Sequence, residues 1–469
     1  MKSLSANQNS RPSIDRNALV AGILLALAAM PVLAEEPNAP AAAEEAAEPA
    51  NTPPGLPSGL KWTFNLDATA GTFGFGDSLY TDPKPEQPSG DLGDNWSEAS
   101  IKPALSAEYT TGSSSQIYGK LSAVGTRTFG AAPTLVGDDA SDFDVEDAYV
   151  GWRSGTSLGD LGENVLDFTV GRTQYKLGHG MLLYDGGADG GSRGGYWTGA
   201  RKAFEFAAIG RFKPGNHTIE AFYLDKDDMP EADSDSKLWG LNYEYAIGED
   251  TTLGATYMKW SADPAEAPQR DGLDVYNFRA YTAPFSGLKG LSFEAEYAQE
   301  DNGDALDSTA WNVLAAYQFG SRWQPKLSYR YAFFEGDDPA TAKNEAFDGL
   351  LTGFSDWGSW WQGEIAGEYF VSNSNLISHQ VRLHVTPSDA ISTGLIFYDF
   401  QLDNAASFGP TVTSDDVGYE LDWYMDWSIN DNFILSFVAA AAEPGDAIEQ
   451  SSGRTDTFIY GMIFAAYSF

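Results

Sequence analysis

Basic side chains stand singly between apolar residues in several stretches of the sequence. Lys102, Arg330 and Arg382 are each flanked on both sides by aliphatic, aromatic or proline residues. An ammonium or guanidinium group in such a position can bind a carboxylate or phosphate group of a solute. It does not by itself supply a nucleophile or a general base. The first chemistry that these residues suggest is therefore binding of anionic groups.

Catalytic and metal-binding chemistry has weaker support in the sequence. Glu294 and Glu296 resemble the carboxylate pair of a glycosidase, but residues two apart on one strand are more simply solvated charges on a single face. The four histidines do not form a metal-binding motif, and only His384 is expected to share a face with a base, Arg382. An embedded enzyme would need a nucleophile beside a histidine, and His384 has no evident Ser–Asp companion. We predict no catalytic residue, no metal site and no cofactor.

Loop-like stretches carry the other unusual compositions. "DGGADGGSRGG" (185–195) does not join a strand to a helix, so it is not a phosphate-binding loop. Two interpretations remain open for it: a loop that folds into or over a pore, and a plain surface loop. "GDDASDFDVED" (137–147) and "DKDDMPEADSDS" (225–236) lack the glycine and glutamate spacing of a calcium loop. We interpret both as solvated loop acids, with bridging of divalent cations at the outer surface as the alternative.

The elements that position the bases show a period of two. "LKWTFNLDATA" (60–70), "IKPALSAEY" (101–109) and "YELDWYMDW" (419–427) alternate apolar and polar residues over about ten positions, which indicates half-buried strands. A soluble sandwich and a membrane barrel both produce this pattern. The strand length, the Tyr and Trp residues near strand ends, and polar faces with charges of both signs favour the barrel. The fold class is predicted to be all-β, a transmembrane antiparallel β-barrel.

Connector lengths fix the predicted number of strands. Short turns such as "TPSDA" (386–390) alternate with long loops, as in outer-membrane barrels with short periplasmic turns and long extracellular loops. Nineteen candidates are found, and the strand number must be even. Because 377–385 must lead into a short turn, 360–370 belongs to a long, surface-exposed loop over 337–375. Eighteen strands remain, and the last one, "FIYGMIFAAYSF" (458–469), is expected to pair with the first.

Three regions are predicted along the chain. Residues 1–34 have the basic start, apolar core and small final residues of a signal peptide, with cleavage near Ala34. Residues 35–59 are rich in Pro, Ala and Glu and form a disordered periplasmic leader, and 60–469 form the barrel. The net charge of −39 argues against nucleic acid as a partner. The expected location is the outer membrane of a Gram-negative cell.

The sequence resembles the alginate-export family of eighteen-stranded outer-membrane channels. The residues that carry the resemblance are "VGRTQYKLGHGMLLYDGGADGGSRGGYWTGARKAF" (170–204), "SNSNLISHQVRLHV" (372–385) and "ELDWYMDWSINDNFILSFVAAAAEPGD" (420–446). The resemblance implies a polysaccharide channel with a basic constriction, and a terminal aromatic residue that the barrel-assembly machinery reads.

Individual family positions carry over to this chain. The resemblance implies that Lys102, before Pro103, and Arg172, after Gly171, line the pore, and that Asp147 tunes selectivity. Alternation places Lys102 and Asp147 inward, and Arg172 inward only past a bulge near Gly171. Glu146 stands where the family has an arginine, so the basic lining is thinned. Alternation also points the following bases inward: Lys120, Arg211, Arg279, Lys326, Arg330 and Arg382.

Two classes of function follow from these observations. The favoured one is a channel for passive passage of a polar or anionic carbohydrate or of small solutes. The alternative is an outer-membrane enzyme or an adhesin on a barrel scaffold. Inward acids are at least as numerous as inward bases, which predicts a weak anion preference at most, or none. The expected partners are outer-membrane lipid and lipopolysaccharide, a polar or anionic solute and the assembly machinery, and the barrel is expected to be a monomer.

Overall fold

A computed structural model describes most of the predicted barrel region. The described residues are 59–76, 95–112, 114–130, 139–285, 287–354, 356–360 and 362–469. The predicted signal peptide and leader lie outside the described residues, except for Gly59.

Strands dominate the described part of the chain. The β-strands are β1 (Leu60–Gly76), β2 (Asn95–Thr110), β3 (Gln116–Phe129), β4 (Ser141–Arg153), β5 (Leu166–Thr173), β6 (Phe204–Phe212), β7 (His217–Asp225), β8 (Lys237–Ile247), β9 (Thr251–Ser261), β10 (Asp274–Thr282), β11 (Leu291–Asp301), β12 (Asp307–Gln318), β13 (Lys326–Phe334), β14 (Leu376–Ser388), β15 (Ile391–Gln401), β16 (Asp416–Asn430), β17 (Phe433–Pro444) and β18 (Phe458–Ser468). The helices are η1 (Gly159–Leu161), α2 (Ala366–Tyr369), α3 (Ala405–Phe408) and α4 (Asp446–Ser452). Among the described residues, no helix has the length and apolar character that a membrane-crossing helix needs.

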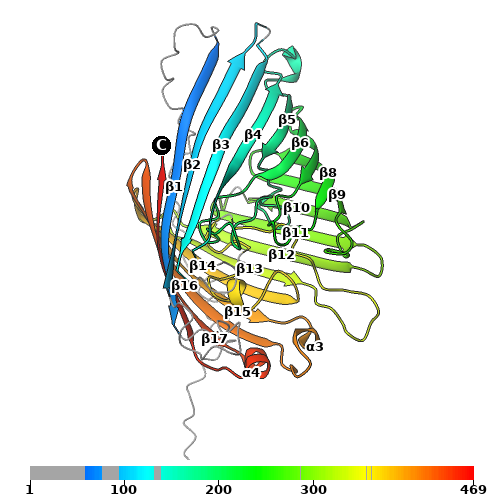
Figure 1. Cartoon of the computed structure of the whole chain (residues 1–469), viewed down its shortest axis with the longest axis vertical. Helices are drawn as coiled ribbons and strands as arrows, with labels where there is room; N and C mark the ends of the chain where they lie inside the picture. Colours follow the sequence, from blue (N-terminus) through cyan, green and yellow to red (C-terminus); the bar gives the residue numbers. More distant parts are fainter. Residues whose placement is uncertain are drawn as a thin grey trace, which may run out of the picture. The chain divides into compact units, whose positions relative to one another are not determined.

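The strands form one closed antiparallel sheet. Each strand pairs with its neighbours in sequence, and β1 also pairs with β18, from Asp67 opposite Ser468 to Gly76 opposite Ile459. The backbone N–H of Leu66 donates to the carbonyl of Phe469 at 2.9 Å, which extends the seam. Figure 1 shows the C-terminal end of the chain beside β1. The prediction of an eighteen-stranded barrel is confirmed by this pairing. Closure leaves no unpaired strand edge to face lipid.

The two faces of the sheet differ as the period-two pattern predicts. Large apolar side chains stand exposed along the strands, including Leu121 at 59%, Phe143 at 70% and Ile459 at 54%. The alternate positions carry polar side chains that contact other groups inside the barrel. In water, so many exposed apolar side chains would be unfavourable, whereas in a membrane they face lipid.

Two register shifts, one between β3 and β4 and one between β5 and β6, interrupt the regular alternation of the wall. The register between β3 and β4 shifts between Leu121 and Ala123, so that Glu146 and Asp147 are both buried although they are adjacent. The register between β5 and β6 shifts between Gly171 and Thr173, next to Arg172. An extra residue in one strand re-aims the side chains beside it. Arg172 lies at this shift, opposite two residues of β6, and its largely buried side chain forms an ion pair with Asp227.

Two long loops fold into the barrel and pack on its inner face. The β5–β6 loop (174–203) buries Leu177, Met181 and Leu182, and the β13–β14 loop (335–375) buries Trp360 and Ile365. In the described residues of the β13–β14 loop the only regular element is the four-residue helix α2, so 360–370 is not a wall strand, as predicted. The expectation that 337–375 is surface-exposed is wrong for the middle of this loop. Its apolar side chains are buried against the wall, which removes them from water.

Candidate functional site

Carboxylates of the wall hold the β5–β6 loop in place. Glu98 on β2 accepts hydrogen bonds from the backbone N–H groups of Trp197 at 2.8 Å and Thr198 at 3.1 Å. Glu146 on β4 likewise accepts from the N–H groups of residues 202 and 203 at 2.8 and 3.2 Å. A loop buried inside a barrel must find partners for its backbone donors, and charged acceptors are the strongest ones. These acids therefore serve as loop anchors.

A second set of acids on β16 holds the β13–β14 loop. Glu420 is fully buried and accepts from the N–H groups of Ile365 at 2.8 Å and Ala366 at 2.7 Å. Asp426 accepts from the indole Nε1–H of Trp357 at 2.9 Å. Acids that the sequence assigns to a mixed lumen wall thus lie beneath a loop. They are used as anchors, so the open part of the lumen is less acidic than the sequence alone indicates.

Burial of loop acids changes their protonation. Burial raises the pKa of Glu364 to about 8, and the neighbouring carboxyl of Glu420 adds to the rise. Burial also raises the pKa of Asp185 to about 7, although Lys202 opposes the shift, and the pKa of Asp189 to about 6, against a hydrogen bond from Arg201. Part of the acidity inside the barrel is therefore neutralised near pH 7.

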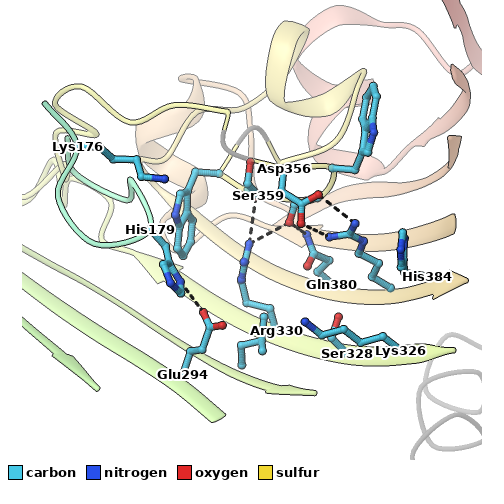
Figure 2. Close-up of a pocket in the computed structure, with 15 residues that line it drawn as sticks. Lys176, His179, Glu294, Lys326, Ser328, Arg330, Asp356, Ser359, Gln380 and His384 are labelled. Carbon is cyan, nitrogen blue, oxygen red and sulfur yellow. Dashed lines mark hydrogen bonds and ion pairs between the residues drawn. The ribbon is translucent and has the colours of Figure 1, made fainter. Parts of the chain in front are cut away.

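Between the two loops and the wall lies a cavity of about 540 Å³. Four bases and two acids line it, together with two histidines, two tryptophans and several small polar groups. Figure 2 shows Lys326 and Ser328 on the strand side and Asp356 and Ser359 on the loop side. The charged, histidine and tryptophan side chains that line the cavity are Lys176, His179, Glu294, Lys326, Arg330, Asp356, Trp357, Trp360, Arg382 and His384.

The strand wall of the cavity comes from β13 and β14. Alternate residues of a strand share a face, and residues directly opposite on paired strands have adjacent side chains. The register pairs Lys326 with His384, Ser328 with Arg382, and Arg330 with Gln380. Six polar side chains therefore form one patch, and three of them are bases predicted from the sequence.

The loop wall is bound to this patch through its own oxygen atoms. Arg382 donates from Nη1 and Nη2 to the two carboxylate oxygens of Asp356 at 2.8 and 3.1 Å. Arg330 donates from Nη1 to the carbonyls of Gly358 and Ser359, both at 3.1 Å, and Figure 2 shows its side chain reaching from the strand toward the loop. The guanidinium carbon of Arg330 also lies 4.4 Å from the ring centroid of Trp360.

The opposite wall brings a β5–β6 loop histidine against an acid of β11. His179 Nδ1 lies 3.0 Å from Glu294 Oε2, and the His179 ring stacks on Tyr281 with centroids 4.1 Å apart. Lys176 from the same loop lies near the ring of Tyr184, at 5.5 Å. With Leu314 of β12, the cavity is thus lined by groups from two loops and four strands.

Three predicted site residues lie near the base of the β5–β6 loop. Lys102 donates to the carbonyl of Ala200 at 3.0 Å and lies 3.6 Å from Glu146. Asp147 pairs with Lys120 at 2.9 Å and accepts from Ser122 at 2.6 Å. Arg172 pairs with Asp227, which also binds Arg193.

The other two lie elsewhere on the inner wall. Arg211 donates to Glu220 at 2.6 Å. Arg279 is only 3% exposed and donates to Asn242 at 2.7 Å and Glu244 at 3.1 Å. Of the eight predicted positions, the structure brings together Lys326, Arg330 and Arg382 in the cavity. The role of all eight in solute passage stays a prediction.

Sequence reasoning missed the loop residues of the cavity. Lys176, His179, Asp356 and Trp357 lie in irregular segments, where no period shows which way a side chain points. The glycine-rich stretch 185–195 was a usable signal, because a loop over the pore was one of its two interpretations. In the structure Gly195 donates to Thr128 on the inner face of β3 at 2.9 Å, which agrees with that interpretation.

Comparison with known proteins agrees with the barrel. The family model described as "Alginate export" matches residues 123–461. The chain belongs to the alginate export family. Among curated protein sequences, none matches this member of the family.

Solved structures show the same fold. OpdQ of Pseudomonas aeruginosa superposes with a TM-score of 0.56 at 13% sequence identity, over 87% of this chain and 98% of that chain. OccK5 (OpdH) of the same organism gives a TM-score of 0.56 at 11% identity, with the same coverage of both chains. OccK2 (OpdF) in complex with glucuronate gives 0.55 at 14% identity, over 87% of this chain and 98% of that one. At this level of identity the likeness establishes an outer-membrane porin fold for this member of the alginate export family.

Proposed function

We propose that this barrel is a passive outer-membrane channel for carboxylated saccharides, and that the lumen cavity is where their carboxylate groups bind. The observation that carries the proposal is the composition of the cavity. Arg330, Arg382, Lys326 and Lys176 supply positive charge, and Trp357 and Trp360 supply apolar faces. Its volume of about 540 Å³ lies within the range of about 300–1,000 Å³ for small-molecule sites.

The chemistry of a sugar acid fits these groups. An arginine fork can bind a carboxylate through two parallel hydrogen bonds, which gives both energy and orientation. Tryptophan faces can pack against the apolar face of a sugar ring, while serine, glutamine and histidine side chains can bond to hydroxyl groups. Glu294 and Asp356 keep the net charge moderate, which favours binding that is weak enough to permit release.

Support of a second kind comes from a structural relative. The OccK2 structure contains glucuronate, a sugar carboxylate. We propose that the same class of ligand enters this channel. The eight sequence-predicted positions then divide by place. Lys326, Arg330 and Arg382 bind the solute, and Lys102, Asp147, Arg172, Arg211 and Arg279 set the field and shape of the wall around it.

The test is single-channel recording in a planar bilayer with glucuronate and with glucose. The two sugars differ in a carboxylate. A carboxylate site therefore predicts that glucuronate blocks the current at concentrations at least about tenfold lower than glucose does, a difference of about 1.4 kcal/mol in binding free energy. Arg330→Gln should reduce the difference. Equal block by both sugars, or strong cation selectivity of the open channel, would contradict the proposal.

We further propose the setting in which this channel works. Residues 1–34 are removed as a signal peptide near Ala34, and 35–59 remain as a periplasmic leader. The barrel is inserted by the assembly machinery, is surrounded by lipid and lipopolysaccharide, and acts as a monomer without catalytic activity. The exposed apolar side chains of the strands and the β1–β18 seam support this setting. Different mobility of unboiled and boiled samples on a gel, with recovery from outer membranes, is the expected outcome.

A further inference from the structure

The anion-binding groups of the cavity are already occupied by oxygen atoms of the chain itself. Arg382 binds the carboxylate of Asp356, and Arg330 binds two backbone carbonyls of the segment 356–360. Gln380 donates to one of the same carbonyls, that of Gly358, at 2.6 Å. A solute carboxylate that enters the cavity therefore meets arginines whose hydrogen bonds are in use.

The Asp356–Arg382 pair has the geometry expected for a bound sugar carboxylate. Both guanidinium Nη atoms donate, one to each carboxylate oxygen, at 2.8 and 3.1 Å. This is the two-point contact by which arginine recognises carboxylates. Arg382 is further held by Tyr424, whose hydroxyl accepts from Nε at 3.0 Å and from Nη2 at 2.8 Å. The arginine is thus fixed in place, and its anion partner is the part that can be exchanged.

Exposure shows which partner can leave. The side chain of Asp356 is 60% exposed, whereas that of Arg382 is 16% exposed. An ion pair with one solvated partner is worth little, about 1 kcal/mol or less, so it can be replaced without a large barrier in free energy. Trp357, the next residue, stays anchored through its bond to Asp426 and its stacking on Tyr424, with centroids 5.4 Å apart. The Asp356 side chain can therefore move while the segment remains docked.

We propose that Asp356 is a specificity-determining residue, a built-in competitor that occupies Arg382 in the empty channel and is displaced by the carboxylate of a solute. This inference rests on the proposed function, since it names the residue that sets which solutes gain the site. A neutral sugar has no group that replaces the carboxylate on Arg382. A carboxylated sugar does, but it must displace Asp356, so the competitor lowers the affinity for carboxylated solutes, excludes those that bind Arg382 weakly, and leaves neutral sugars unaffected.

The experiment compares block by glucuronate in wild type and in Asp356→Asn. The substitution keeps the size of the side chain and removes its charge, so the competition for Arg382 is lost. We expect about fivefold tighter block by glucuronate, which corresponds to about 1 kcal/mol, and no change in block by glucose. Asp338→Asn is the matched control, because it removes one negative charge from the same loop at an exposed site. The Asp338 carboxylate accepts a hydrogen bond from the Ala340 N–H within its own turn.

A double-mutant cycle separates competition from a general charge effect. In an Arg382→Gln background, Asp356→Asn should give little further gain, because there is no shared partner to release. A gain of equal size in both backgrounds would overturn the inference, since it would reflect only the lost negative charge. Heat-modifiable gel mobility of each variant shows that the barrel is assembled. If an Asn variant fails to assemble, Asp356→Ser provides the same comparison.

The failure of the inference differs from the failure of the proposed function. If wild type and Asp356→Asn are blocked by glucuronate with the same affinity, Asp356 is not a competitor, and the carboxylate channel stands. If neither is blocked more strongly by glucuronate than by glucose, the carboxylate site itself fails, and the inference fails with it. If only Asp356→Asn is blocked more strongly by glucuronate, Asp356 is a competitor, but the wild-type channel does not bind carboxylated sugars and the proposed function fails.

Discussion

Leu183 and Leu351 are parallel bridge partners inside the barrel, although they belong to loops on opposite halves of the sequence. The N–H of Tyr184 donates to the Leu351 carbonyl at 2.8 Å, and the Leu351 N–H donates to the Leu182 carbonyl at 2.9 Å. The β5–β6 loop and the β13–β14 loop are therefore joined by backbone hydrogen bonds. These hydrogen bonds couple the two loops that form walls of the cavity.

The first prediction concerns this contact. Leu183 is fully buried, and Leu183→Ala removes apolar contacts at the point where the loops meet, at a cost of about 2–5 kcal/mol typical of buried leucine. We expect a noisier open-channel current and faster proteolysis within both loops, with unchanged heat-modifiable mobility of the barrel. Leu161→Ala is the control, because that leucine is 54% exposed. Faster cleavage in the β5–β6 loop alone would show that the loops are not coupled.

The second prediction concerns the anchor on β16. Glu420→Ala leaves the N–H groups of Ile365 and Ala366 without their acceptors in a buried place, and each such loss costs about 1–3 kcal/mol. We expect the β13–β14 loop to undock and the single-channel conductance to rise. Glu420→Gln retains one acceptor oxygen and should have a smaller effect.

A charge-matched control distinguishes anchoring from electrostatics. Glu449→Ala removes the same charge from the exposed side of α4 and should leave the conductance as in wild type. An increase of equal size in Glu449→Ala and Glu420→Ala would mean that charge, not anchoring, sets the conductance.

Part of this arrangement follows from the sequence, for a definite reason. Lys326, Arg330 and Arg382 lie on strands, where a period of two fixes the face of each side chain, so their inward direction is readable. The burial of Glu146 together with Asp147 is not readable, because it depends on a bulge whose position is set by pairing with β3. The strand number is readable from connector lengths and closure.

The loops could be predicted much less well. The apolar residues around Trp360 indicate that this segment is buried. A segment without periodicity does not show which strand it packs against. Glu420 illustrates the consequence. Alternation shows that it points inward, and only the position of the loop shows that it binds Ile365 and Ala366 instead of facing the pore.

The third prediction concerns pH. The pKa of Glu364 is raised by burial from its usual 4.5 to about 8, and the pKa of Glu368 is also raised by burial. The docked loop therefore holds protons that the undocked loop releases, so docking is strongest at low pH and weakens as pH rises from about 4.5 to about 8. Above that window, no further loss from Glu364 is expected. Conductance recorded at pH 5 and at pH 8 should be higher at pH 8.

Glu364→Gln tests the origin of this pH dependence. The amide stays neutral at every pH, so the difference between pH 5 and pH 8 should become smaller. It should not vanish, because burial raises the pKa values of Asp185 and Asp189 in the β5–β6 loop as well, to about 7 and about 6. Opening of the channel on acidification would contradict the sign of the linkage.

The last prediction concerns the field of the cavity. Lys326 is exposed at the end of β13 and lines the cavity, so Lys326→Glu reverses a charge that the solvent and permeant ions reach. We expect the reversal potential in a salt gradient to shift toward cation preference at about 0.1 M salt, and the shift to shrink at about 1 M. The reason is the screening length, which falls from about 10 Å to about 3 Å over this range. Lys213→Glu, in an exposed short turn after β6, is the matched control and should leave the reversal potential near that of wild type. An equal shift in the two variants would mean that overall charge, and not the cavity, determines selectivity, and an unchanged potential in Lys326→Glu would place the permeation path away from β13.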